Sequence, residues 1–189
     1  MRILKKFSPL FLILAVIGDF SLPYYLGRSY PGFDQMTMII SQLGESTSPV
    51  QTYFNNGSII TGSLFILSSI GVYDFFQSES KGLAQIVAGA IALYGFGDCL
   101  LTGLIKISDT ASFFNPAYFL HAAFSGIAMV AMMFVPLLLA YQASLKRQKV
   151  VSLFYAVCLL GSLLALFLFA AYYLPIIGSL LSSTRGFWQ

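Results

Sequence analysis

Five long apolar stretches are the feature that most limits how this chain can fold. Each is long enough to cross a hydrocarbon core about 30 Å thick, which takes roughly 20 residues of helix. An open sheet or a coil would leave backbone hydrogen-bonding groups unsatisfied in lipid. We therefore predict an all-α fold, a polytopic transmembrane helix bundle. The five predicted spans cover approximately residues 8–26, 52–75, 83–105, 118–142 and 150–174.

The residue composition agrees with a lipid environment. The 189 residues are 58% hydrophobic and 9% charged, whereas soluble domains carry roughly 25% charged residues. Such a chain has too few charges to cover a surface that faces water. We therefore expect residues 1–189 to form a single integral membrane domain, a multi-pass protein of the cell (cytoplasmic) membrane. The net charge of +3 is not gathered in one patch, so we expect membrane lipid, and no nucleic acid, as a partner.

The basic residues predict which way the chain crosses the membrane. If the N-terminus is inside, the inner segments hold seven Lys and Arg residues and the outer segments hold three. Because inner loops carry the excess of Lys and Arg in membrane proteins, we predict that the N-terminus is inside and the C-terminus outside. The inner residues are Arg2, Lys5, Lys6, Lys81, Lys146, Arg147 and Lys149, and the outer ones are Arg28, Lys106 and Arg185.

The first outer loop, residues 27–51, is the longest connection in the chain. It carries Pro31-Gly32, which is typical of a turn, and then residues 35–43, which are apolar with one polar face. We predict that residues 35–43 form a short interfacial helix, which Gly44 and Pro49 would end.

Polar side chains gather toward the outer ends of the predicted spans. Asp19, Asp98 and His121 lie inside spans one, three and four, and an Asp at the centre of a transmembrane helix costs at least about 2.5 kcal/mol on insertion scales. Two asparagines open span two, and polar residues of the long loop can fold over the same region. The candidate ligand-binding residues are Asp19, Ser41, Glu45, Asn55, Asn56, Asp98 and His121.

Two interpretations of this polar group stay open. In one, it is a buried hydrogen-bonded cluster that fixes helix packing. In the other, it lines an outward-facing pocket under the long loop that binds a lipid head group or a small ligand. Asp98 and His121 are then the candidate catalytic acid/base pair of a membrane-embedded enzyme acting on a lipid. A transport or proton-coupled component is a further alternative, which the lack of paired broken helices disfavours.

Other site chemistries have less support in the sequence. Ser41 or Ser125 can be combined on paper with His121 and Asp98 as a catalytic triad, but no nucleophile-elbow motif accompanies them. Cys99 and Cys158 stand alone inside apolar runs, as small core residues do, and the chain has one histidine. We therefore expect no metal site and no cofactor.

Several short motifs resemble a known family. They are Tyr30-Pro-Gly-Phe-Asp34, Ile40-Ser-Gln-Leu-Gly-Glu45, Pro49, Phe54-Asn-Asn-Gly57 and Gly62, followed by an Asp late in span three and a His opening span four. Together they resemble the bacterial and archaeal membrane family known as domain of unknown function 998, which is similar in outline to six-span proteins of the Frag1/DRAM type. The resemblance covers roughly residues 19–126 and implies a fold but no activity.

The resemblance also implies a sixth span. Members usually have six, and residues 184–189 look like the outer turn that would precede the last one. We therefore expect either a natural five-span form or a truncated reading frame.

Overall fold

The computed structural model describes residues 2–107, 115–171 and 177–188, and these residues are largely helical. Five helices of the described chain are long and apolar enough to cross a membrane, which confirms the predicted fold class. They are α1 (Arg2–Arg28), α2 (Gln51–Phe76), a third span that begins with α3 (Lys81–Tyr94), α5 (Pro116–Leu145) and α6 (Lys149–Ala171). Residues 172–174 of the predicted fifth span lie outside the described residues.

The third span is not a uniform α-helix. After α3 the chain continues as a π-helix, η2 (Gly95–Leu101), and then as one short turn, α4 (Thr102–Leu104). We predicted one continuous span over residues 83–105, so the π-helix is a feature that the apolar pattern did not reveal. Gly95 and Gly97 have low intrinsic helix propensity, which makes this segment the place where the α-helical ladder gives way most easily.

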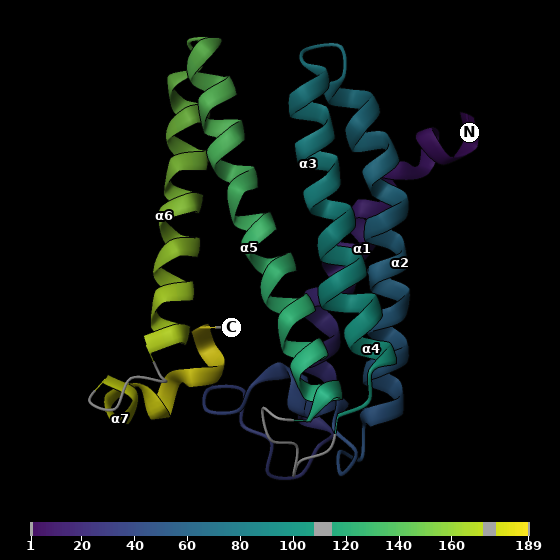
Figure 1. Cartoon of the computed structure of the whole chain (residues 1–189), viewed down its shortest axis with the longest axis vertical. Helices are drawn as coiled ribbons and strands as arrows, with labels where there is room; N and C mark the ends of the chain where they lie inside the picture. The colour runs from purple at the N-terminus through teal and green to yellow at the C-terminus, as the bar shows by residue number, and fades with distance from the viewer. Residues whose placement is uncertain (1, 108–114, 172–176, 189) are drawn as a thin grey trace.

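The helices alternate in direction, so the connections fall at two ends (Figure 1). The N-terminal end of α1 and the short connections α2–α3 and α5–α6 lie at one end. The α1–α2 connection lies at the other, together with α7 (Ile177–Leu181) and η3 (Ser182–Trp188). Below, these are called the inner and outer ends, following the predicted orientation.

The long outer loop differs from its prediction. In place of a helix over residues 35–43, it forms turns and then a 3-10 helix, η1 (Ile40–Gly44). The reason lies in Asp34, whose carboxylate accepts from the Met36 backbone N–H at 2.9 Å and from the Thr37 hydroxyl at 2.9 Å. Such local side-chain bonds compete with helical hydrogen bonds.

The backbones of α2 and the third span approach each other closely. Gly62 of α2 faces Gly95, and a Cβ atom added to Gly95 would lie 2.6 Å from the Gly62 carbonyl oxygen. Only hydrogen atoms fit there, as at many helix contacts in lipid. The hydrophobic core of the bundle contains Ala15, Phe65, Val87, Ile91 and Cys99.

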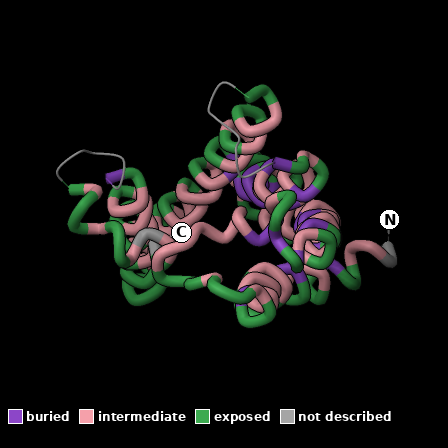
Figure 2. Tube along the Cα trace, turned by 90° about the horizontal axis from the view of Figure 1, so that it is seen from below, coloured by how far each residue is buried: buried purple, intermediate pink, exposed green. Residues whose placement is uncertain are grey.

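The α5–α6 hairpin is attached to this bundle on one side only. Among the described elements, α6 packs along α5 and touches α7 and η3, and Ala171 is its one buried residue. Buried residues therefore gather in the helices around α2 (Figure 2).

Polar contacts tie the helices together at the inner end. Glu79, in the α2–α3 connection, accepts hydrogen bonds from Lys146 and, at 3.1 Å, from Gln142 of α5. Nearby, Lys5 and Asp74 form an ion pair at 2.5 Å between α1 and α2. These contacts fix the relative position of the inner helix ends.

Candidate functional site

A cavity of about 460 Å³ lies in the outer half of the bundle. Its walls come from α1, α2, η2 and α5, and residues of the long loop and of η3 lie around its mouth. Pockets that bind small molecules have volumes of roughly 300–1,000 Å³, so the cavity is large enough for a ligand. Its polar lining residues are Asp19, Tyr24, Gln35, Ser41, Asn55, Ser58, Thr61, Tyr94, Asp98, Thr102, His121 and Ser125.

Asp98 is presented by the π-helix. The Ser125 hydroxyl of α5 donates a hydrogen bond to Asp98 Oδ1. This short side chain can reach because η2 and α5 are close: a Cβ atom added to Gly97 would lie 2.9 Å from the Phe124 carbonyl oxygen. Single π-helical turns occur frequently at functional sites. The π-helix that contains Asp98 therefore favours this cavity as the functional site.

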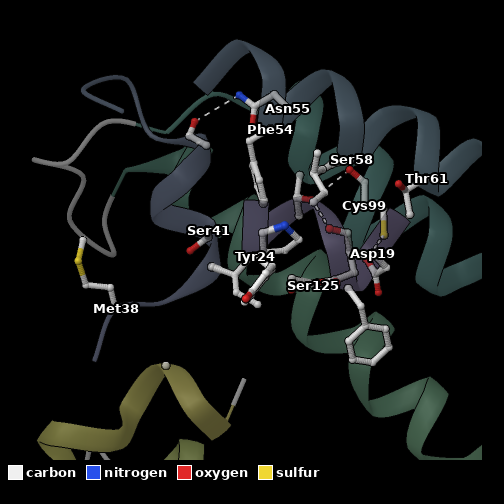
Figure 3. A pocket seen from close by; sticks show the side chains of 18 of the residues that line it. Asp19, Tyr24, Met38, Ser41, Phe54, Asn55, Ser58, Thr61, Cys99 and Ser125 are labelled. Atoms are coloured by element: carbon white, nitrogen blue, oxygen red, sulfur yellow. Dashed lines mark hydrogen bonds between the residues drawn. The ribbon is translucent and has the colours of Figure 1, made fainter. Parts of the chain in front are cut away.

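Asp19 is held from the third span. The Tyr94 hydroxyl donates to Asp19 Oδ2 at 2.7 Å, and the Cys99 thiol donates to Oδ1 at 3.7 Å. Figure 3 shows Asp19, Cys99 and Ser125 as neighbours around the same space. Asp98 lies within electrostatic range of both Asp19 and Tyr94, so two carboxyl groups from different spans face one cavity.

His121 stands one helical turn before Ser125 on α5. The backbone of Ile105 lies near its imidazole. The Nδ1 atom is buried and has no hydrogen-bond partner among the described residues. In a neutral imidazole one nitrogen donates and the other accepts, so Nδ1 is an acceptor in the tautomer that carries its proton on Nε2.

Asn55 anchors the loop that covers the cavity. Its side-chain amide donates to the Gly44 carbonyl oxygen at 3.2 Å, as Figure 3 shows, and Gln51 donates to the same oxygen at 3.3 Å. η1 is thereby held against the start of α2, with Ser41 lining the cavity. The other side of the mouth is tied by the Gly186 backbone N–H, which donates to the Met36 carbonyl oxygen at 2.8 Å.

The structure brings five of the seven candidate residues together and leaves two outside. Asp19, Ser41, Asn55, Asp98 and His121 line the cavity, whereas Asn56 and Glu45 do not. Asn56 is exposed because successive residues point about 100° apart around a helix, and the contact with Gly44 turns Asn55 inward.

Several lining residues were not among the candidates. Tyr94 lies four residues before Asp98 in the third span, and this spacing is the signal that could have identified it. Ser125, four residues after His121, was considered only as a triad nucleophile and not as a ligand-binding residue. Cys99, expected as a plain core residue, contacts Asp19. Ser125 does not form a Ser–His–Asp triad with His121 and Asp98, because its hydroxyl donates directly to Asp98. No group of three or more His, Cys, Asp or Glu side chains suited to a metal is found in the described residues.

The cavity reaches the surface of the protein beside α1. Phe20 of α1 is one of its lining residues and is 78% exposed. Residues of α5 also line the cavity, although α1 and α5 have almost no direct contact with each other. The apolar core residues Val87 and Ile91 are not among the described residues that line the cavity.

Comparison with known proteins gives one result. The model of a family described as "Protein of unknown function (DUF998)" matches residues 13–186. No curated protein and no solved structure matches the chain.

Proposed function

Because this chain belongs to the DUF998 family, for which no function is known, we propose from its cavity that it is a lipid-binding protein of the cytoplasmic membrane. As a single membrane domain with its N-terminus inside, it holds the polar head of a lipid, or of a similar small amphiphile, in the outer half of the bilayer. The observation that carries the proposal is the exposed Phe20 at the edge of a polar cavity. A lipid can enter there while its chain stays in the bilayer.

The sizes and surfaces involved support a partial insertion. At about 460 Å³ the cavity suits a head group and the first part of a chain rather than a whole two-chain lipid. Its deep end carries Asp19, Asp98 and Ser125, and the exposed apolar side chain of Phe20 lies at its edge. This is the arrangement of polar and apolar surface that an amphiphile matches.

The test is lipid retention by the purified full-length protein. Met129→Trp places a larger side chain at the cavity wall, and Val130→Trp, on the lipid-facing side of the same helix, is the matched control. We expect native mass spectrometry to find bound lipid in the wild type and in Val130→Trp, and much less in Met129→Trp. Equal retention by the two variants would contradict binding in this cavity.

A second candidate function is catalysis on the bound lipid. It is favoured by His121, which lines the same cavity as Asp98 and whose Nδ1 has no hydrogen-bond partner among the described residues. A neutral imidazole can accept a proton as a general base. The discriminating variant is Asp98→Asn. An enzyme would lose lipid turnover while its thermal stability and bound lipid were kept, whereas a binding protein shows no turnover to lose.

A further inference from the structure

We propose that the group held at the deep end of the cavity is a hydrogen-bond donor without negative charge: the hydroxyl or amine head of a lipid, not a phosphate or a carboxylate. This rests on the proposed function and specifies its ligand. The proposal is carried by the hydrogen-bonding state of three side chains, Asp19, Asp98 and His121, together with the absence of basic residues among the described lining residues.

The unused hydrogen-bonding capacity at the deep end consists of acceptors. Each carboxylate offers about four lone-pair sites, and Asp19 receives one bond from Tyr94 and one weak bond from Cys99. The buried Nδ1 of His121 has no partner among the described residues and is an acceptor in the tautomer that carries its proton on Nε2. A buried acceptor without a partner is destabilising, so a ligand that brings donors is favoured there.

The charges at this depth have one sign. Asp19 and Asp98 face the cavity, and no Lys or Arg is among the described residues that line it. Arg28, at the outer end of α1, is outside the lining and stacks over the Tyr24 ring, 4.5 Å from its centroid. An anionic group beside the two carboxyls would find no cation among the described lining residues, in a medium where unpaired charge is costly. A neutral donor needs no cation as a partner, and a cationic donor can pair with the carboxyl groups themselves.

The hydroxyl-bearing lining residues suit the same ligand. Ser41, Ser58 and Thr61 line the cavity, and a hydroxyl can both donate to and accept from the hydroxyl of a ligand. A polyol head group therefore finds acceptors at the deep end and groups of both kinds around it. An amine finds the two carboxyls, so hydroxyl and amine share the property that the site selects.

The test compares four probes with the same decyl chain: an amine, a glycerol ether, the dimethyl ether of that glycerol, and a phosphate. The protein is the full chain in detergent, carrying Cys158→Ala so that Cys99, which lines the cavity, is its one thiol. The measured quantity is the rate at which a small uncharged maleimide alkylates Cys99. A probe in the cavity slows this reaction.

We expect the amine or the glycerol ether, or both, to protect Cys99 at concentrations about tenfold or more below those of the phosphate and the dimethyl ether. Protection by the amine alone assigns the selectivity to charge, and protection by the glycerol ether assigns it to hydrogen bonding. Equal or better protection by the phosphate or the dimethyl ether would overturn the proposed ligand class while leaving lipid binding intact. If no probe protects Cys99 and Met129→Trp still lowers lipid retention, the ligand class is also wrong.

A variant pair links the selectivity to the site. His121→Phe removes the buried Nδ1 atom and should reduce the advantage of the glycerol ether over the dimethyl ether. Asn56→Ala, an exposed position outside the cavity, should leave it unchanged. An unchanged advantage in His121→Phe would remove His121 from the proposal. Absence of bound lipid in the wild type, together with no protection by any probe, would defeat the proposed function itself.

Discussion

The Tyr94 hydroxyl donates a 2.7 Å hydrogen bond to Asp19, a residue 75 positions earlier in the chain. This bond joins the third span to the first at the depth of the cavity. It gives a partner to a carboxyl group that lipid could not solvate, and it leaves other lone pairs of the same carboxylate free to face the cavity. One residue thus contributes to helix packing and to the site.

Tyr94→Phe should destabilise the protein by roughly 1–3 kcal/mol, because it removes the stronger donor to Asp19 and leaves the partly buried carboxylate with the Cys99 thiol. Thermal unfolding in detergent measures the change. Tyr53→Phe, at a position that is 72% exposed on α2, is the control. Equal unfolding midpoints for the two variants would mean that the hydrogen bond from Tyr94 to Asp19 does not stabilise the protein.

His121→Phe should change stability by less than about 1 kcal/mol, since any contact with the Ile105 backbone that it loses is offset by removal of a buried nitrogen that has no partner among the described residues. The same variant should retain less bound lipid. Unfolding midpoints and native mass spectra of one preparation check both. A large fall in stability would favour the interpretation in which His121 belongs to a cluster that only fixes helix packing.

Gly62→Ala should destabilise the bundle by about 1–3 kcal/mol, as overpacking does, because the added Cβ atom would lie 2.8 Å from the Leu100 backbone nitrogen and 2.9 Å from Cys99 Cβ. Gly161→Ala, on α6 with open space around it, should be neutral or stabilising by up to about 1 kcal/mol through helix propensity. Chemical or thermal unfolding of both variants provides the comparison. Equal effects would contradict the close approach of α2 and η2.

The contact between Glu79 and Lys146 at the inner end predicts that the stability of the protein falls at acidic pH. The hydrogen bond from Lys146 holds the pKa of Glu79 below its ordinary value of 4.5. A carboxyl whose pKa is lower in the folded state stabilises the protein above its ordinary pKa, and this contribution is lost as the pH falls from about 4.5 through the lower folded value. Glu79→Gln should therefore reduce the stability difference between pH 7 and pH 4. An identical dependence of stability on pH in the wild type and the variant would show that the Glu79–Lys146 contact does not stabilise the protein.

The fold was predictable from the sequence because the constraint on it is simple. A lipid environment requires each apolar run to satisfy its own backbone hydrogen bonds, so span number and helical state follow from run length alone. The helix ends differ from the prediction by a few residues, since capping by Ser80 and Asn115 depends on polar side chains beyond the apolar runs. Capping extends a helix past the point where hydropathy ends.

The site was predictable only in part. Asp19, Asp98 and His121 stood out because ionisable groups at membrane depth are rare. The choice of Asn55 over Asn56 depended on where Gly44 lies, and the bond between Ser125 and Asp98 depended on a π-helix. Both are consequences of tertiary contacts between segments far apart in sequence, which the local pattern does not contain.

The contacts of Glu79 with α5 fix one end of that helix. Lys146 and Gln142 pin its inner end, while its outer end carries His121 and Ser125 and has almost no contact with α1. A helix of 30 residues is about 45 Å long, so a rotation of about 5° around the pinned end displaces the far end by about 4 Å. The same rotation would separate Ser125 from Asp98, so the polar contact at the deep end of the cavity and the width of the proposed lipid entrance would change together.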